Sequence, residues 1–357
     1  MLATGSKKRI ILGMSGGVDS SVAALLLRDQ GYIVKGVALK LWAYNAENPC
    51  CSTKDLNDAQ MIAKHLGIEF EILDVQEAFK RSVVDYYIKE LSEGRTPNPC
   101  IVCNDYLKFG LLLNYALENN YDFVATGHYA RIQINETGYH LMKSFDQEKD
   151  QSYFLFMLDQ KRLPNILFPL GELTKEKVRG IARHAELITC GKKDSQELCF
   201  LPEGGSEEFY RTYTNFAPQA GMIIDSKGKV VGTHKGLQFY TIGQRRGIGA
   251  FTNKPVYVVN KNIKDNSLTI GTHEDLMASI LTVKDVHWII SPPAFPMYAN
   301  VRIRYRHKEK KALITNENDV ITIKFDSPQR AITPGQAAVF YNGDEVLGGG
   351  WIWEVKE

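Results

Sequence analysis

Apolar and polar residues follow two different patterns along this chain of 357 residues. Over residues 8–127, short apolar runs such as KRIILGM and IVKGVALKLW are separated by stretches with helical spacing. In TKDLNDAQMIAKHLG one helical face carries Leu56, Ala59, Ile62, Ala63 and Leu66. Strands that alternate with helices of this length predict βαβ crossovers and a doubly wound parallel sheet covered on both faces.

The second pattern begins after residue 205 and consists of short strands with tight turns. GMIIDSKGKVVGTH predicts a hairpin with Ser-Lys-Gly at its tip, and from about residue 275 strand follows strand to the end of the chain. We therefore expect an α/β domain over 1–205, a small central domain over 206–274 and an all-β barrel over 275–357.

Composition adds little to this picture but excludes some classes of protein. The chain is 44% hydrophobic and 24% charged, which is typical of a globular protein. No run is long enough to span a membrane, and MLATGSKKRI lacks the apolar stretch of a signal peptide. We expect a cytoplasmic protein without a membrane partner, and a monomer.

The stretch ILGMSGGVDSS at 11–21 is the first candidate for chemistry. A strand, two glycines and a helix start place backbone N–H groups around an anion, and the serine hydroxyls add donors. Asp19 is placed to hold Mg²⁺ or to cap the helix. The lysine of G-x-x-x-x-G-K-[ST] is missing, and G-x-G-x-x-G does not fit. A plain glycine turn is the simpler interpretation, but the strand–loop–helix context favours phosphate binding.

Two cysteines stand in loops that favour reactivity. Cys103, in GRTPNPCIVCNDYLKFG, is expected next to a helix start, which lowers the pKa of a thiol, and Cys199 follows a polar stretch in KKDSQELCF. Structural disulfides are disfavoured in a cytosolic chain, so these thiols indicate redox, metal or sulfur chemistry. Cys50 and Cys51 are adjacent and have no assigned role, and Cys190 is expected to be structural.

A basic stretch points to nucleic acid. RIRYRHKEKK at 302–311 contains six Lys or Arg residues in ten positions, with Tyr305 among them. If VRIRYRH is a strand, alternation places Arg302, Arg304 and Arg306 on one face, where they could follow a phosphate backbone. A solvated basic face is the alternative interpretation.

Several motifs taken together resemble one family over nearly the whole chain. They are GMSGGVDSS, GRTPNPxxxCN, ATGHYAR, KDQSYFL, KKDSQELCF, YTIGQRRGIG, RIRYR and TPGQAAVFYNG. The glycine loop is similar to that of the N-type ATP pyrophosphatases, and the full set resembles the tRNA-specific 2-thiouridylases. The resemblance implies an ATP pyrophosphatase domain, a small central domain and a C-terminal β-barrel. It implies an enzyme that replaces the C2 oxygen of a tRNA wobble uridine with sulfur.

The resemblance also implies roles for individual residues. ATP would be bound by Gly13, Met14, Ser15, Gly16, Gly17, Val18, Asp19, Ser20, Leu39 and Gly127. Asn98, Pro99 and Cys100 would contact the target base. Cys103 would be the catalytic nucleophile and Cys199 the carrier of a persulfide. tRNA would be contacted by His128, Lys149, Asp150, Gln151, Arg304, Tyr305 and Gln336.

The order of the sulfur chemistry stays open at this point. ATP, with Mg²⁺, would adenylate the C2 oxygen. The terminal sulfur of the Cys199 persulfide would then attack C2 directly, or Cys103 would attack the persulfide and release hydrosulfide, which attacks C2. Either route can end in a Cys103–Cys199 disulfide. Cys100 stands where many members of the family carry an acid, so a [4Fe–4S] cluster on Cys100, Cys103 and Cys199 is an alternative, with zinc a weaker one. Other possibilities are an ammonia-using synthetase, or a non-catalytic RNA-binding or sulfur-carrier protein. The family suggests tRNAs for Lys, Glu and Gln, and a cysteine desulfurase or sulfur-relay protein as the sulfur donor.

Overall fold

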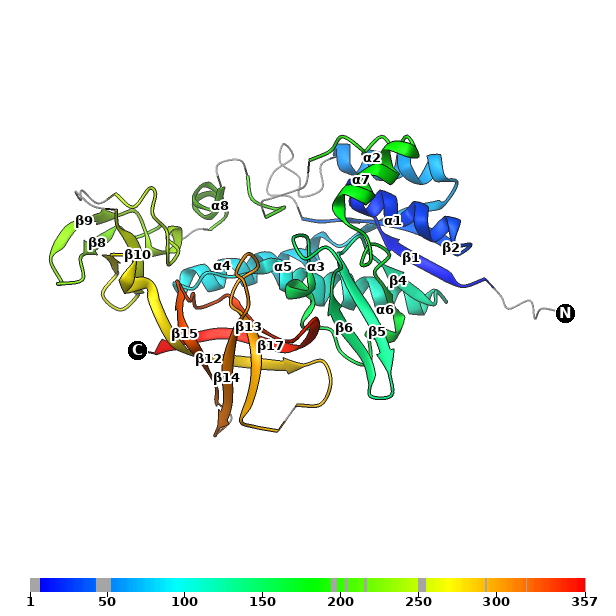
Figure 1. The fold of residues 1–357 in the computed structure, drawn as a ribbon. Helices are drawn as coiled ribbons and strands as arrows, with labels where there is room; N and C mark the ends of the chain where they lie inside the picture. Colours follow the sequence, from blue (N-terminus) through cyan, green and yellow to red (C-terminus); the bar gives the residue numbers. More distant parts are fainter. Residues whose placement is uncertain are drawn as a thin grey trace. The chain divides into compact units, whose positions relative to one another are not determined.

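The structure is a computed structural model that describes residues 7–42, 53–193, 198–202, 205–214, 217–249, 255–292, 294–318 and 320–356 (Figure 1). The chain forms two compact units, and neither is continuous in sequence. The first unit comprises Met1–Val83, Cys100–Leu201 and Asp344–Val346. The second comprises Val84–Pro99, Pro202–Gly343 and Leu347–Glu357. The predicted borders at 205 and 274 stay predictions.

A parallel sheet of five strands organises the first unit. Its order is β3 (Glu69–Asp74), β2 (Ile33–Lys40), β1 (Arg9–Gly13), β4 (Phe123–Ala125) and β7 (Ile166–Leu167). Every neighbouring pair is parallel, and Gly13 at the end of β1 lies opposite Val37 of β2. The chain leaves β1 toward β2 and returns to its other side at β4, so the order reverses beside β1.

Helices cover both faces of this sheet, which confirms the predicted doubly wound fold. They are α1 (Val18–Asp29), α2 (Thr53–Leu66), α3 (Gln76–Phe79), the π-helix η1 (Lys80–Val84), α5 (Pro99–Val102), the π-helix η2 (Cys103–Leu111), α6 (Leu112–Glu118) and α7 (Lys175–His184). Because side chains alternate along β1, Ile10 and Leu12 join the core with α1, α2 and α7, whereas Ile11 joins the core with α6.

Smaller elements complete the first unit. They are the hairpin β5 (Ala130–Asn135) and β6 (Gly138–Lys143), and the 3₁₀ turns η3 (Ser152–Leu155) and η4 (Leu163–Asn165). Asp344–Val346, from the far end of the chain, folds with this hairpin. Asp344 pairs with Arg131 at 3.0 Å, and Glu345 accepts a 2.6 Å hydrogen bond from His140 Nδ1.

In the part of the second unit that the structure describes, helices accompany a small mixed sheet. The helices are α4 (Asp85–Ser92) and α8 (Gly205–Tyr213), with the 3₁₀ turn η5 (Leu237–Phe239). The sheet order is β10 (Tyr257–Asn262), β11 (Ser267–Gly271), β8 (Gly221–Ile224) and β9 (Val230–His234). The β8–β9 hairpin confirms the prediction made for GMIIDSKGKVVGTH.

The remaining strands form the expected closed barrel. After the 3₁₀ turn η6 (Glu274–Leu276), they are β12 (Met277–Trp288), β13 (Met297–Arg302), β14 (Lys310–Glu317), β15 (Val320–Arg330), β16 (Ala337–Asn342) and β17 (Glu345–Lys356). Their order is β12-β15-β14-β13-β16-β17, and antiparallel pairing of β12 with β17 closes the ring. Alternate residues of β13, Ala299 and Val301, face the barrel core.

The predicted arginine row is wrong. β13 ends at Arg302, and residues 303–307 form a turn, so alternation does not continue through Arg304 and Arg306. Arg302 is buried, pairs with Glu309 at 3.0 Å and lies over the Tyr341 ring. A buried guanidinium needs a carboxylate partner, and the turn brings Glu309 back to supply it.

Candidate functional site

The glycine loop lies where β1 ends and α1 begins. Gly17 precedes the helix with extended backbone, and Gly16 has a φ of +69°, a conformation that glycine adopts without strain. A Cβ atom at Gly16 would lie 2.2 Å from the carbonyl oxygen of Asp55, so only glycine fits. The hydroxyls of Ser20 and Ser21 donate to the Gly17 carbonyl, at 3.2 and 2.8 Å. The result is a helix N-terminus framed by hydroxyls and suited to an anion.

The turn after β4 meets this loop at the point where the strand order reverses. A Cβ atom on Gly127 would lie 2.8 Å from the backbone nitrogen of Ser20. On the other side, the amide of Met14 donates to the Val37 carbonyl at 2.9 Å, and Leu39 lies two residues further along β2. The structure therefore brings together the residues predicted to bind ATP, at the carboxyl edge where such sheets bind ligands.

Two lysines from distant parts of the chain contact the loop, which has no lysine of its own. Lys175, at the start of α7, donates to both carboxylate oxygens of Asp19 at 2.7 Å, and Tyr129 donates to one of them at 2.8 Å. Lys192 donates to the Gly16 carbonyl at 2.9 Å and pairs with Asp55 and with Asp58. Burial lowers the pKa of Lys192, but the hydrogen bonds to these two carboxylates outweigh it and leave the pKa raised.

Sequence reasoning missed both lysines as loop residues. Lys192 stands in KKDSQELCF, where only Cys199 is singled out by the sequence, and nothing in KEKVRG distinguishes Lys175 from its neighbours. The contacts at Asp19 also bear on Mg²⁺. Asp19 is the only carboxylate of the loop, and both of its oxygens accept from Lys175. The loop thus presents no open carboxylate to a metal ion, and we assign no step to one there.

Replacing Lys192 by methionine should weaken ATP binding. The loss of its ammonium releases the Gly16 carbonyl and leaves Asp55 and Asp58 without their cation, so the loop loses shape and gains negative charge. We expect the KM for ATP to rise about tenfold, the equivalent of one charge-assisted hydrogen bond. Lys193→Met, at the exposed neighbouring lysine, is the matched control. Equal KM values for the two variants would refute the role of Lys192.

The predicted position of Cys103 beside a helix start is wrong. Helical structure begins at Pro99 and continues through α5, η2 and α6 to Glu118. Proline is favoured at a first helical position, and it moves the helix start four residues ahead of Cys103. Cys100 occupies the first turn instead. Cys100 is exposed as a residue, but its thiol is partly desolvated by the surrounding protein. This desolvation, and then the charge of Cys199, raise the pKa of Cys100 to about 11, although Lys108 lowers that pKa.

Cys199 lies within electrostatic reach of Cys100 and on a turn anchored by an aromatic contact. Leu201 N donates to the Leu198 carbonyl at 3.1 Å, and the ring of the adjacent Phe200 meets that of Phe79 edge-on at 5.8 Å. Cys199 is exposed and Cys103 half-buried. The site therefore has its second predicted cysteine close to the helix that carries the first.

The iron–sulfur alternative is not supported. Among the residues that the structure describes, no three His, Cys, Asp or Glu side chains are arranged to hold a metal ion, and Cys100, Cys103 and Cys199 belong to those residues. Cys50, Cys51 and the DSQE part of KKDSQELCF lie outside the described residues. Cys190 packs beside the core of α1, α2 and α7.

The residues predicted to contact tRNA differ in accessibility. His128 is 7% exposed, its Nδ1 lies 2.7 Å from Thr126 Oγ1, and burial followed by Lys108 lowers its pKa well below the usual value. Asp150 is buried and accepts from the amide of Ser144 at 3.1 Å. Gln151 accepts from the Tyr129 amide at 2.9 Å, and Lys149 is half-buried beside them. His128 and Asp150 thus present little surface to a partner.

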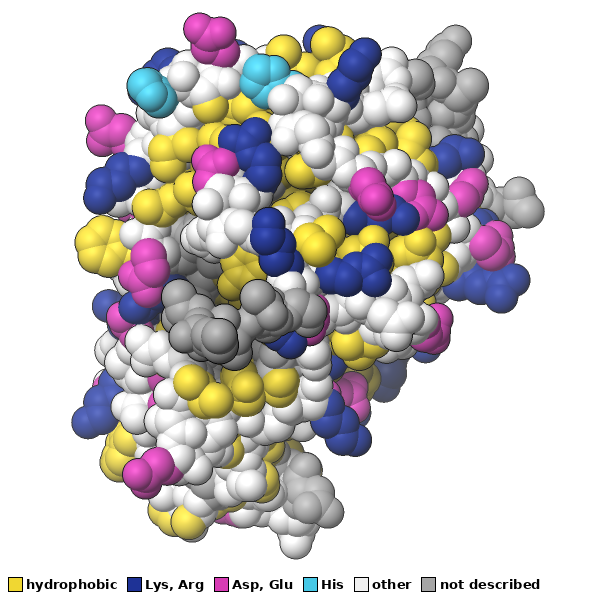
Figure 2. Space-filling model, turned by 90° about the vertical axis from the view of Figure 1, so that its right-hand side faces the viewer, with side chains coloured by type: hydrophobic (Ala, Val, Ile, Leu, Met, Phe, Trp, Pro, Cys, Tyr) yellow, Lys and Arg dark blue, Asp and Glu magenta, His cyan; other side chains and the backbone are white. Residues whose placement is uncertain are grey.

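Arg304 and Tyr305 lie in the turn after β13, where positive charge is concentrated. Burial, then Arg304 and Lys310, lower the pKa of His307 to about 4. On the face in Figure 2, by comparison, Lys and Arg side chains are interspersed with Asp and Glu. The basic residues of this turn suit it to phosphate contacts.

The pKa of His307 predicts a pH dependence of stability. A histidine titrating near 6.5 when unfolded and at about 4 when folded binds fewer protons in the native state. Its contribution is complete above pH 6.5 and is lost as the pH falls toward 4. His307→Gln should flatten the fall in Tm between pH 7 and 5, whereas His65→Gln, at an exposed histidine of α2, should follow the wild type. Parallel Tm profiles for all three proteins would contradict this.

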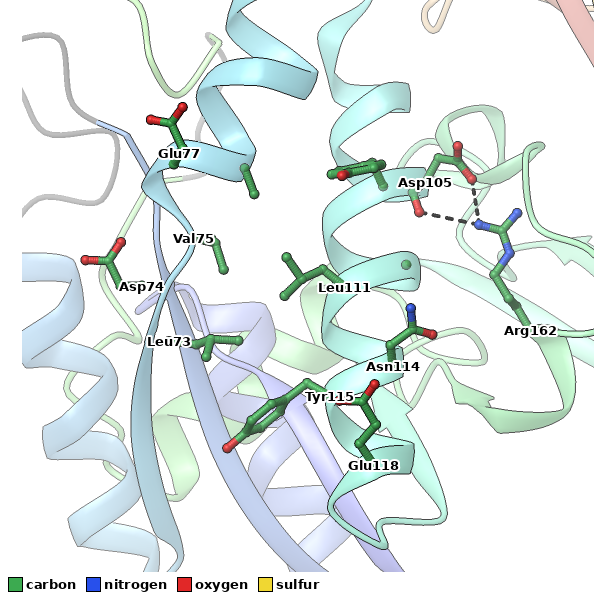
Figure 3. Close-up of a pocket in the computed structure, with 13 residues that line it drawn as sticks. Leu73, Asp74, Val75, Glu77, Asp105, Leu111, Asn114, Tyr115, Glu118 and Arg162 are labelled. Atoms are coloured by element: carbon green, nitrogen blue, oxygen red, sulfur yellow. Dashed lines mark hydrogen bonds and ion pairs between the residues drawn. The ribbon is translucent and has the colours of Figure 1, made fainter.

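A cavity of about 850 Å³ lies elsewhere in the first unit (Figure 3). It is bounded by the end of β3 and by η2 and α6, with Asp105 pairing to Arg162 at 2.6 Å across its rim. None of the predicted ATP-binding residues and neither predicted catalytic cysteine lines it. We place the chemistry at the glycine loop, where the anion-binding groups are. Within the described part of the chain, no helix is long and apolar enough to cross a membrane.

Comparison with known proteins decides the family. Family models match residues 8–203 (tRNA methyl transferase HUP domain), 207–272 (tRNA methyl transferase PRC-barrel domain) and 278–352 (aminomethyltransferase beta-barrel domain). The tRNA-specific 2-thiouridylase MnmA of Clostridium perfringens is 43% identical over 354 residues, covering 97% of this chain and 99% of its own. That of Geobacter metallireducens is 42% identical, covering 97% of each chain.

The chain belongs to the tRNA-specific 2-thiouridylase family. The matched ranges span the glycine loop, both predicted cysteines and the barrel. Membership in the thiouridylase family implies ATP as substrate and Mg²⁺ as its companion ion. It gives no support to an ammonia-using synthetase or to a non-catalytic carrier.

Proposed function

We propose that this protein catalyses the ATP-dependent 2-thiolation of the wobble uridine in tRNA. The observation that carries the proposal is the placement, in one compact unit, of the phosphate-binding loop Gly13–Ser20 and the pair Cys103 and Cys199. A phosphate-binding loop alone serves many synthetases. Sulfur transfer requires a pair of cysteines in addition, and Cys199 lies within electrostatic reach of Cys100, in the helical stretch that continues to Cys103.

The loop and its lysines bind the polyphosphate of ATP. The α1 N-terminus supplies backbone donors, the Ser15 and Ser20 hydroxyls lie beside it, and Lys175 and Lys192 supply positive charge where pyrophosphate leaves. The uridine C2 oxygen attacks the α-phosphate, so the P–O bond to pyrophosphate breaks and an adenylated base forms. This converts a poor leaving group into AMP.

Sulfur then arrives as a persulfide on Cys199. Its terminal sulfur attacks C2 and AMP departs with the former C2 oxygen. The Cys103 thiolate attacks the Cys199 sulfur, so the S–S bond breaks and the electron pair remains on the transferred sulfur as the thiocarbonyl forms. The products are 2-thiouridine, AMP, pyrophosphate and a Cys103–Cys199 disulfide that a thiol reductant must open. Asn98, Pro99 and Cys100 hold the target base in this scheme.

The partners follow from the same chemistry. We propose tRNAs for Lys, Glu and Gln as substrates, and a cysteine desulfurase or sulfur-relay protein as the donor that loads Cys199 in the cytoplasm. The Arg304–Tyr305 turn and Lys149, Gln151 and Gln336 would contribute tRNA contacts. A carrier without catalysis would bind the same tRNA but release no pyrophosphate.

The test is a reconstitution with unmodified tRNA, ATP, a cysteine desulfurase and cysteine. We expect 2-thiouridine, detected by retarded migration in a mercury-containing gel, to accumulate with AMP and pyrophosphate in equal amounts. Omitting ATP should abolish it. Pyrophosphate release that needs ammonia and not the sulfur source would instead indicate an amide-forming synthetase.

A further inference from the structure

The barrel turn 334–336 is hydrogen-bonded to the segment that leads into the predicted base-contact residues. Segment 84–99 belongs to the second unit, together with the barrel. The amide of Thr96 donates to the Pro334 carbonyl at 2.9 Å, and the side-chain amide of Gln336 donates to the carbonyls of Thr96 at 2.9 Å and of Pro97 at 3.4 Å. Three hydrogen bonds thus hold the two residues immediately before Asn98.

The turn itself is held firmly. Gly335 N donates to the Ile352 carbonyl at 2.9 Å, and Ile352 N donates to the Gln336 carbonyl at 2.8 Å, which ties the turn to β17. Arg95 lies over the Trp353 ring of the same strand, at 5.2 Å, and forms a two-point ion pair with Glu90 of α4. The barrel therefore contacts this segment both at Arg95 and at Thr96 and Pro97.

The contact is close enough to exclude any side chain at residue 335. Gly335 has a φ of +90°, and a Cβ atom there would lie 2.9 Å from Arg95 Cβ and 2.9 Å from the Thr96 nitrogen. Thr96 could make room only by moving its backbone. Thus the spacing between turn and segment, and not only the hydrogen bonds, depends on the identity of residue 335.

We propose that Gly335 and Gln336 are positioning residues that set the backbone leading into Asn98, Pro99 and Cys100, and through it the placement of the target uridine. The inference rests on the proposed function for the meaning of that triplet. It gives Gln336 a task besides the tRNA contact suggested by family resemblance, because its Nε2 atom is engaged by the protein itself. A misplacement of about 1 Å at reacting groups costs on the order of 100-fold in rate.

The test compares Gly335→Ala with Gly343→Ala in the full chain. Gly343 also has a positive φ, of +59°, but an added Cβ would meet nothing within 4 Å, so the control carries the backbone strain without the collision. We expect Gly335→Ala to lower thiolation turnover at saturating tRNA by at least about tenfold. The KM for ATP and the Kd for tRNA should match those of Gly343→Ala. Gln336→Met, which removes the amide without adding charge, should lower turnover at saturating tRNA to a similar extent, whether or not the Kd for tRNA also rises through the loss of a tRNA contact.

A second readout needs no catalysis. Amide hydrogen exchange of Thr96, whose N–H donates to Pro334, should be faster in Gly335→Ala and in Gln336→Met than in Gly343→Ala. This measurement holds even if the wild-type protein fails to thiolate tRNA, so the failure of the proposed function and the failure of the positioning role are distinguishable. Unchanged Thr96 exchange would overturn the proposal. So would faster exchange with unchanged turnover, or a Gln336→Met variant that loses only tRNA affinity.

Discussion

Cys199→Ser and Cys103→Ser are each expected to abolish thiolation, by at least about 10³-fold, while pyrophosphate release with tRNA persists. A serine at 199 cannot carry a persulfide, and a serine at 103 cannot complete the sulfur exchange. The groups that we propose for adenylation, by contrast, lie in the loop Gly13–Ser20 and are untouched by either substitution. The measurement is a single-turnover assay that follows pyrophosphate and 2-thiouridine in the same sample.

The double variant makes this prediction sharper. If the two cysteines act as a unit, Cys103→Ser combined with Cys199→Ser should be no slower than either single variant. Cys190→Ser, at a cysteine that packs beside the core of α1, α2 and α7, is the matched control and should keep wild-type rates. Thiolation that survives Cys199→Ser would remove the persulfide route. If Cys103→Ser keeps thiolation activity and Cys199→Ser loses it, an external thiol reductant can replace Cys103 in the attack on the Cys199 sulfur.

Gly16→Ala is expected to remove ATP-dependent activity, by about 100-fold or more in kcat/KM for ATP. The residue has a φ of +69°, and the new methyl group would collide with the Asp55 carbonyl at 2.2 Å, a backbone atom at the start of α2 that cannot step aside alone. The loop must therefore shift by an ångström or more, which takes its donors away from the phosphates.

Gly67→Ala separates this collision from simple backbone strain. Gly67 has nearly the same φ, +66°, at the end of α2, but an added Cβ there meets nothing within 4 Å. Both variants should lose roughly 1–2 kcal/mol of stability from the left-handed conformation. Only Gly16→Ala should also lose ATP turnover. Equal activities for the two variants would mean that the loop does not bind the nucleotide in this geometry.

The fold was predictable because its periodic signals are strong. The apolar run at 9–13 and the helical spacing at 53–66 require burial on both sides of a strand and on one side of a helix, and the structure has β1 and α2 there. The glycine loop was also predictable, because only glycine fits where the backbone must approach a ligand closely. A site of this kind can be predicted because its residues are adjacent in the sequence.

What the sequence hid depends on contacts between residues far apart in the chain. Lys175 and Lys192 reach the loop from more than 150 positions away, and no local pattern marks either of them. The predicted arginine alternation does not extend beyond Arg302, because the strand ends there. The following turn places Glu309 against the buried Arg302 guanidinium, which needs a carboxylate partner. The start of the Cys103 helix was misplaced for a smaller reason, namely that Pro99 can open a helix as well as block one.

The interleaving of the two units has a consequence for anyone who wishes to cut or recombine this protein. Residues 84–99 fold with the barrel, while Asp344–Val346 fold with the β5–β6 hairpin. A fragment that stops at residue 205 would keep the nucleotide loop, but it would carry an unsupported 84–99 segment and leave His140 and Arg131 without Glu345 and Asp344. We therefore expect that neither part of the chain folds correctly when it is moved alone into another protein. Shuffling at the apparent domain borders should yield chimaeras with damage on both sides of the cut, so the enzyme can be exchanged between species only whole.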